Sequence, residues 1–279
     1  MKYSRRRIIN IIYLVTIFSS GISNADIIYN TDTKYPNQFS SELFNIKCPS
    51  SKKDAKSEYL CALKMMKNSQ KEKEVSKKTL LNLASENIAD AKYSLFISRK
   101  TLEISEKNAI SYLFESANQG FVPSQLMLGE MYLNGDIIEK NEEKAFKWTK
   151  LAAEQNSYDG ILGISRYYFS GTGTKRNDSL GFYWLSKLHD NFGPLFSDWD
   201  ILGAAYETGR GTPVDLVKAY MCYDLEGTAG TEEKARIAPQ MTAEQRAEGL
   251  RLSHEWQEKN HVYTMQSLGL SRQKDGSYR

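Results

Sequence analysis

The stretch of this sequence with the clearest chemical potential is a glycine-rich turn, GTGTKRNDSLGFYW, at residues 171–184. Gly171 and Gly173 stand one residue apart, Lys175 and Arg176 follow, and the next residues have helical character. A glycine-rich turn that opens a helix can bind phosphate through its backbone N–H groups. Because a phosphate loop follows a strand, the elements around the turn decide whether it is a nucleotide site or a helix boundary.

Two further groups of polar residues could do chemistry. His254, Glu258 and His261 share a face of the last helix and could hold a metal ion, although ligands on one terminal helix are more commonly solvated. Carboxylates that could form acid/base pairs, but are typical of a solvated helix face, are Glu130, Glu207, Asp198 and Asp200. The sequence contains no HExxH, GxSxG or paired CxxC motif. We predict no catalytic residue, no metal site and no cofactor, and therefore a protein that is not an enzyme.

An internal repeat accounts for the glycine pair. Segments 128–156, 164–192 and 202–230 align in steps of 36 and 38 residues. The aligned positions hold Tyr132, Tyr168 and Tyr206; Gly135, Gly171 and Gly209; Asn141, Asn177 and Asp215; Ala145, Gly181 and Ala219; and Trp148, Trp184 and Cys222. The pattern GTG recurs as GRG at 209–211 and as GDI at 135–137, whereas Lys175 does not recur. We therefore predict that the glycines end a helix and bind no phosphate.

Each repeat is predicted to be a helix, a turn and a second helix. An aliphatic residue precedes each tyrosine by four positions and is followed by a small residue, as in Leu128 and Gly129. The small residues allow the partner helix to come close. The asparagine or aspartate at the next aligned position is a natural N-cap for the second helix.

These motifs resemble the Sel-one-like repeat (SLR) family, which is related to the tetratricopeptide repeats. The resemblance is carried by LGEMYLNG…EKAFKWTKLAAEQN, LGAAYETGRGTPVDLVKAY and, with lapses at Leu180 and Gly181, ISRYYFSGTGTKRN…YWLSKL. A degenerate copy covers 91–120, with Phe96 at the tyrosine position. The resemblance implies an all-α, right-handed solenoid of stacked helix-turn-helix repeats, with a helical cap at each end.

The predicted organisation has five parts. A signal peptide at 1–25 has a basic start, an apolar stretch from Ile8 to Phe18 and a small-x-small cleavage signal that ends at Ala25. Next come an N-terminal segment and helical cap (26–87) and about four repeats (88–230), of which the first is degenerate. A capping helix (231–267), with a capping box from Thr242 to Gln245, and a flexible tail (268–279) complete the chain.

Export sets the charge and the redox environment that we expect. Removal of residues 1–25 takes away four cations and no anions, so the formal net charge falls from +3 to −1. A chain of this charge, with no basic stripe, is not expected to bind nucleic acid, and no other segment is apolar enough to insert into a membrane. In the periplasm Cys48 and Cys61 could form a disulfide, the alternative being two separate thiols. Cys222 is expected to be buried.

Protein binding is the function class that these features favour. Candidate contact residues on the concave face of the first helices are Glu130, Arg166, Phe169, Trp199 and Glu207. Exported SLR proteins include immunity proteins, so the most specific prediction is a monomer that binds and blocks a secreted antibacterial toxin, for example a type VI phospholipase effector. The alternatives are a periplasmic scaffold that regulates a sensor or envelope complex and, less favoured, a β-lactamase-like enzyme.

Overall fold

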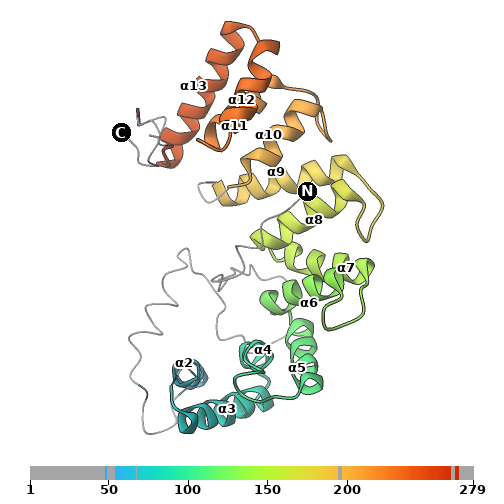
Figure 1. Cartoon of the computed structure of the whole chain (residues 1–279), viewed down its shortest axis with the longest axis vertical. Coiled ribbons are helices and arrows are strands. Elements are labelled where there is room, and N and C mark those ends of the chain that lie inside the picture. The colour runs from blue at the N-terminus through green and yellow to red at the C-terminus, as the bar shows by residue number, and fades with distance from the viewer. Residues whose placement is uncertain (1–47, 49–53, 67, 194–196, 265–267, 270–279) are drawn as a thin grey trace. The chain divides into compact units, whose positions relative to one another are not determined.

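The computed structural model describes residues 48, 54–66, 68–193, 197–264 and 268–269 (Figure 1). All regular elements in this part of the chain are helices. They are α2 (Ala55–Met65), α3 (Gln70–Ser85), α4 (Ala89–Ile97), α5 (Glu106–Asn118), α6 (Val122–Asn134), α7 (Glu142–Glu154), α8 (Tyr158–Ser170), α9 (Asp178–Phe192), α10 (Trp199–Thr208), α11 (Leu216–Leu225), α12 (Thr231–Ile237), the 3-10 helix η2 (Ala238–Gln240) and α13 (Ala243–Asn260). The predicted fold class, an all-α protein of stacked helical repeats, is confirmed.

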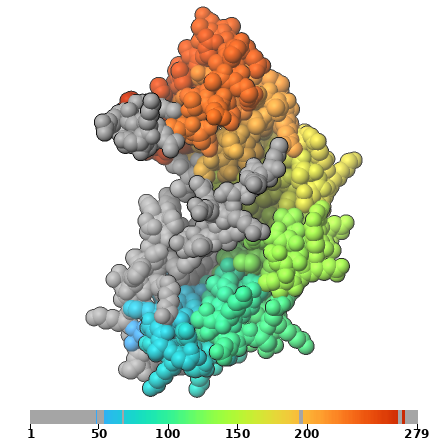
Figure 2. Space-filling view, viewed as in Figure 1, coloured from blue at the N-terminus to red at the C-terminus, as the bar shows by residue number. Residues whose placement is uncertain are grey.

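The chain divides into two compact units, Met1–Gly160 and Ile161–Arg279. Within each unit, neighbouring helices of the sequence pack as pairs, among them α2 with α3, α4 with α5, α6 with α7, and α10 with α11. Figure 2 shows the same locality, because neighbouring colours lie side by side within each unit. Contact mainly between sequence neighbours is the property that defines a repeat protein.

The aligned positions of the repeat form one hydrogen-bonding unit. The backbone N–H of each cap residue donates to the carbonyl of the aligned tyrosine, at 2.8 Å for Asn141 and Tyr132. The side chain of Asn141 then accepts from the backbone N–H of Lys144 at 2.9 Å and begins α7. Asn177 and Asp215 begin α9 and α11 in the same way, so the three predicted N-caps are confirmed. The predicted capping box of Thr242 and Gln245 begins α13.

The aligned glycines end the first helix of each pair, as predicted. Gly135, Gly171 and Gly209 have φ of 77°, 79° and 70°, in the left-handed region that favours a residue without Cβ. The small residues within these helices allow close packing. A Cβ on Gly129 would lie 2.6 Å from Thr149 Oγ1, and one on Gly203 would lie 2.7 Å from the ring of Tyr223.

The degenerate first repeat is a helix pair without a glycine turn. Phe96 of α4 is 2% exposed, and Ala109 and Ala117 of α5 face the same core. Residues between the two helices supply Leu102, which packs in the apolar cluster that α2, α3 and α4 share. Burial of Leu102 thus fixes a connection that has no glycine to end its first helix.

The region 231–267 was expected to form one capping helix, and among its described residues it is interrupted. Pro239 lies in η2, between α12 and α13, because proline has no backbone N–H to continue an α-helix. Arg246 of α13 donates from Nη1 to the carbonyls of Ala238 and Met241 and so fixes the corner between the two helices. The predicted signal peptide at 1–25 lies outside the described residues, and so does most of the predicted tail.

Candidate protein-binding site

The glycine-rich turn at 171–177 connects two helices and follows no strand. Its cation Arg176 donates to Asp178 at 2.7 Å through Nη2. Arg210, which follows the aligned glycine of the next repeat, reaches the same carboxylate through Nε at 3.3 Å and donates to the carbonyl of Phe169. These contacts join two neighbouring repeats and give Arg176 and Arg210 structural roles, whereas Lys175 is exposed.

Two of the five predicted contact residues are exposed. Glu130 on α6 faces solvent. Burial raises the pKa of the nearby Tyr93 phenol to about 12, and the charge of Glu130 adds to this effect. Arg166 on α8 has 58% of its side chain exposed and contacts Asp198, with 3.4 Å between Arg166 Nη2 and Asp198 Oδ1. An ion pair with an exposed arginine contributes little to folding, so Arg166 can contact a partner, and Glu130 can do so because it faces solvent.

The other three predicted contact residues have structural roles, which corrects the expectation that they are exposed. Phe169 is 5% exposed, because Gly181 packs on its ring and the guanidinium of Arg210 lies 4.3 Å from the ring centroid. Glu207 accepts from the hydroxyl of Tyr223 at 2.7 Å and pairs with Arg236 of α12. Arg236 and the hydrogen bond from Tyr223 keep the pKa of Glu207 below its ordinary value.

Trp199 is also buried, at 4% exposure, and it leads to a site that sequence reasoning missed. Its ring packs edge to face on Trp256 of α13, with 4.8 Å between the centroids and 85° between the ring planes. His189 of α9 packs on another side of Trp199 at 5.3 Å. The signal in the sequence was Trp256, an aromatic residue in a polar terminal helix, although the repeat pattern does not link it to Trp199.

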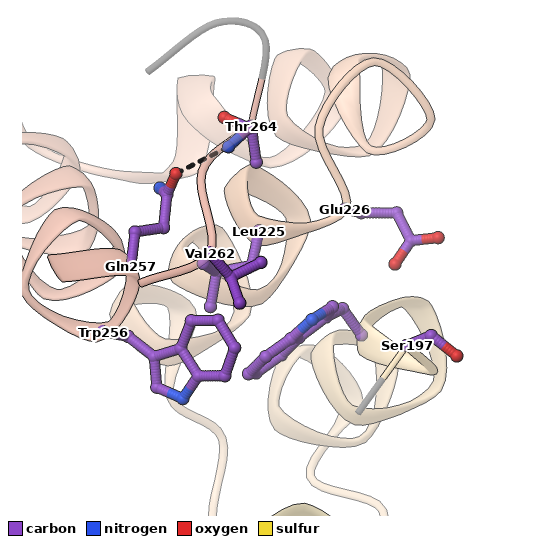
Figure 3. A pocket seen from close by; sticks show the side chains of 8 residues that line it. Ser197, Leu225, Glu226, Trp256, Gln257, Val262 and Thr264 are labelled. Atoms are coloured by element: carbon purple, nitrogen blue, oxygen red, sulfur yellow. Dashed lines mark hydrogen bonds between the residues drawn. The ribbon is translucent and has the colours of Figure 1, made fainter. Parts of the chain in front are cut away.

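A cavity of about 270 Å³ lies beside these two tryptophans (Figure 3). We call it the Trp256 pocket, and its main walls are Trp199, Leu225, Glu226, Trp256, Gln257 and Val262. Trp256 and Gln257 stand on one side in Figure 3, and Glu226 and Ser197 stand on the other. The walls therefore come from the start of α10, the end of α11 and the end of α13.

A buried chain of polar groups holds the α13 wall in place. Lys234 Nζ lies 2.5 Å from Asp224 Oδ1, and Ser253 Oγ donates to Asp224 Oδ2 at 2.7 Å. Gln257 Nε2 donates to Ser253 Oγ at 3.0 Å, and Gln257 Oε1 accepts from the backbone N–H of Thr264 at 2.8 Å. The chain fixes the rotation of α13 and the path of the residues after it, because a buried polar group left without a partner is costly.

Glu226 gives the Trp256 pocket its charge. Its Oε2 is buried and has no hydrogen-bond partner among the described residues. Burial raises the pKa of Glu226 to about 7, the charges of Asp200, Asp198 and Glu233 act in the same direction, and a hydrogen bond from the backbone of Asp200 opposes them. The carboxylate therefore lacks the cation that would stabilise its charged form.

The remaining candidate ligands do not gather into a metal site. His254, Glu258 and His261 are exposed, and His261 ends α13 with a positive φ of 54°. Within the described ranges no group of three or more His, Cys, Asp or Glu side chains is placed to hold a metal ion. Nor does any helix there combine the length and apolar character that are needed to cross a membrane.

The three cysteines are free thiols, of which Cys61 and Cys222 are buried and Cys48 is exposed. Cys222 is fully buried, which raises the pKa of its thiol. Cys48 and Cys61 are separate thiols, and they lie side by side: burial and contact with Cys48 raise the pKa of Cys61 to about 12. Their predicted disulfide stays a prediction.

Comparison with known proteins supports the repeat. Residues 122–157, 161–188 and 201–225 match the Sel1 repeat family model, and these segments fall on α6 with α7, α8 with α9, and α10 with α11. No curated protein matches the chain in sequence.

Several solved structures are similar to this chain, and two of them illustrate the likeness. One is a protective antigen present in uropathogenic Escherichia coli strains that displays an SLR fold, with a TM-score of 0.60 and 23% identity over 74% of this chain. The match spans 46% of that protein, so this chain corresponds to about half its length. The other is a Sel1 repeat protein from Oxalobacter formigenes, with 27% identity, a TM-score of 0.40 and coverage of 46% of this chain and 97% of that one. The first of these similarities establishes the fold alone.

Proposed function

We propose that this protein is a periplasmic, protein-binding repeat scaffold and, more specifically, an immunity protein that binds a secreted antibacterial toxin and blocks its active site. A type VI phospholipase effector is one example of such a toxin. The supporting observation is that different positions of the repeat have different roles. Recurring positions such as Leu128, Gly129 and Asn141 pack or cap the helices, whereas some of the positions between them, Glu130 and Arg166 among them, are exposed.

Separate packing and exposed positions suit a protein that binds other macromolecules. Stacked helix pairs place the exposed positions of successive first helices along an extended surface, which can grip another folded protein. Substitution at exposed positions alters the contact surface without altering the packing of the repeat. Toxin and immunity pairs need this freedom, because each immunity protein has to bind its own toxin and not the others.

The proposed location depends on the first 25 residues. Their basic start, short apolar stretch and small-x-small ending have the pattern of a secretory signal. Export would bring the protein to the compartment where a delivered phospholipase attacks the membrane. The formal net charge of −1 for residues 26–279 is compatible with a partner that presents cations.

Co-expression tests the proposal. A periplasm-directed toxin from a gene adjacent to this one is induced in a sensitive host, together with the full chain or with a chain that lacks residues 2–25. We expect survival only with the full chain, and a stable complex when the purified mature protein and toxin are mixed. The matched control is an inactive toxin variant, which is harmless but still binds.

The outcomes separate the specific function from the general one. Death of the host despite expression of the exported protein, with no complex formed, would overturn the immunity function. Purification of a resident envelope complex in place of a toxin would favour the alternative of a regulatory scaffold. Rescue by the chain without its leader would overturn the periplasmic location.

A further inference from the structure

The Trp256 pocket has a size and wall chemistry that suit one side chain. Its volume of about 270 Å³ is slightly below the usual range of roughly 300–1,000 Å³ for small-molecule sites. Trp199, Trp256, Leu225 and Val262 make much of the wall apolar. An aromatic and aliphatic pocket of this size is a common place for an anchoring side chain at a protein interface.

The charges around the pocket indicate which side chain fits. Glu226 Oε2 is buried without a partner, and the carboxylates of Asp200, Asp198 and Glu233 act on Glu226. Two cations that contact residues of this region are already paired, Arg166 with Asp198 and Lys234 with Asp224. A positive group that enters the pocket would neutralise Glu226 and relieve the repulsion among these carboxylates.

The tryptophans favour the same kind of guest. The face of an indole ring attracts an ammonium or guanidinium group within about 6 Å of its centroid, and tryptophan does so more strongly than other aromatic residues. The alkyl stem of lysine or arginine can pack on Val262 and Leu225 while the charged end reaches Glu226. A neutral side chain could fill the apolar part only, and would leave Glu226 Oε2 buried without a partner.

We propose that the Trp256 pocket binds a lysine or arginine side chain of the partner protein, with the cation on Glu226 and the stem against Trp256 and Val262. This inference rests on the proposed protein-binding function and adds to it the residue type that anchors the partner. Binding of the cation selects the charged form of Glu226, so the interaction is stronger above the pKa of this residue than below it.

The pH dependence follows from the groups that face Glu226. Burial is the main cause that raises the pKa of Glu226 to about 7, and the charges of Asp200 on α10, of Asp198 just before it and of Glu233 on α12 add to it. From α13 the pocket is faced by Trp256 and Gln257, neither of which titrates. Lowering the pH from about 8 to about 6 therefore protonates Glu226 and is expected to weaken cation binding several-fold.

Blocked tripeptides provide a test that needs no partner protein. Acetyl-Gly-Lys-Gly-amide, the arginine equivalent and a norleucine equivalent are titrated into the mature chain, and the indole N–H signal of Trp256 is followed by NMR. Norleucine is the matched control because it keeps the lysine stem and removes the charge. We expect saturable binding of the lysine or arginine peptide, with the norleucine peptide at least about tenfold weaker, which is about 1.4 kcal/mol.

Variants of the chain identify the site. Glu226→Gln is expected to weaken binding about tenfold and to abolish the pH dependence. Trp256→Phe should weaken binding by a smaller factor, because phenylalanine keeps an aromatic face that attracts a cation, although less strongly than tryptophan. The matched control is Glu232→Gln, an exposed carboxylate on α12, which should change neither. The thermal unfolding of each variant is measured first, and because Glu226→Gln is nearly isosteric it keeps the test valid if Trp256→Phe is unstable.

Equal binding of the norleucine peptide, equal binding by Glu226→Gln, or no saturable binding of either cationic peptide would overturn the inference. These results are independent of toxin neutralisation. If the protein rescues the host but its pocket binds neither cationic peptide, the proposed function stands and the proposed lysine or arginine site is wrong. If the protein binds the peptides but neutralises no toxin, the proposed lysine or arginine site stands and the immunity function is wrong.

Discussion

The N-terminal helices and the C-terminal helices close their cores by different means. Around α2, α3 and α4 the closure is mainly aliphatic: Leu80, Leu83, Leu95 and Leu102 are at most 2% exposed and form one cluster. Two buried hydrogen bonds accompany it, between Tyr59 and Ser94 and from Ser76 to the carbonyl of Ala62. Around α11, α12 and α13 the apolar cluster is smaller and a chain of buried polar groups runs beside it, from Lys234 to the backbone of Thr264. Each end was expected to act as a cap, and at the C-terminal one Glu226 lines the Trp256 pocket.

The difference shows what each type of closure is suited to. Aliphatic burial is strong but has no preferred direction, so it stabilises the stack without fixing the position of any one side chain. Hydrogen bonds between buried groups have defined geometry, and they fix the rotation of α13 through Ser253 and Gln257. The buried polar groups therefore help to hold Trp256 and Val262 in the wall of the pocket.

The largest effect is expected at the aliphatic end. Leu80→Ala removes a fully buried side chain from the cluster of α2, α3 and α4, and should lower the free energy of unfolding by about 3 kcal/mol, through lost burial and the cavity that remains. Urea denaturation followed by circular dichroism measures the loss. Leu151→Ala on α7, where the leucine is 43% exposed, is the matched control and should cost less than about 0.5 kcal/mol. Equal losses would contradict an N-terminal closure by burial.

Oxidation should strengthen the same end by a slightly smaller amount. Because the thiols of Cys48 and Cys61 lie side by side, oxidised glutathione is expected to join them, with two thiols of the protein converted to one disulfide as glutathione is reduced. A loop of this length contributes about 2 to 3 kcal/mol. Peptide mapping identifies the bond, and thiol titration should leave Cys222 alone reduced.

Cys48→Ser and Cys222→Ser form the matched pair for this experiment. The first should abolish the gain on oxidation and the second should preserve it, whatever its own effect on stability. A bond that joins Cys222 to either of the other cysteines would contradict the pairing. Oxidation that forms the predicted bond without raising the unfolding midpoint would show that the N-terminal segment is not anchored by it.

Removal of a single hydroxyl should destabilise the C-terminal helices. Ser253→Ala removes the group between Asp224 and Gln257, so that one acceptor and one donor lose a buried partner, and we expect a loss of about 2 kcal/mol. The indole signal of Trp256 should also broaden or shift, because Gln257 is released from its position. Ser170→Ala, at an exposed serine of α8, is the control and should do neither. A stability loss with an unchanged Trp256 signal would separate the polar chain from the pocket.

The contrast also marks what the sequence could predict. The N-caps Asn141, Asn177 and Asp215 and the aligned glycines were predictable because their roles are local: each depends on residues within a few positions, and the repeat shows them more than once. The order of helices follows from the same pattern. Local rules acting on repeated residues thus give most of the fold.

The site depends on contacts that no local pattern encodes. Trp199 and Trp256 are 57 positions apart, and the second lies in a helix outside the repeat, so nothing in the alignment joins them. Phe169 and Glu207 were predicted as contact residues because they fall between recurring positions. Arg210 and Arg236, residues of later elements, cover them instead. Whether a side chain between the recurring positions is exposed therefore depends on the next element as much as on its own helix.

The smallest effect tests the charge of the Trp256 pocket, and it is a gain. Burial raises the pKa of Glu226 to about 7 in the folded protein, against an ordinary value of 4.5, so the folded state binds the proton more tightly than the unfolded state does. The native protein therefore loses stability as the pH rises from about 4.5 through about 7. Glu226→Gln removes this loss and should raise the free energy of unfolding by about 1 kcal/mol at pH values above about 7, after allowance for solvent screening.

The sign of this effect distinguishes a pocket that awaits a cation from an ordinary surface carboxylate. Below a pH of about 4.5 the native and Glu226→Gln proteins should have equal stability, since both are neutral at this position, and denaturation curves at several pH values measure the divergence. Glu232→Gln should give parallel curves. A stability loss for Glu226→Gln at high pH would mean that the carboxylate already has a stabilising partner within the chain, and the polar end would then be closed as completely as the aliphatic one.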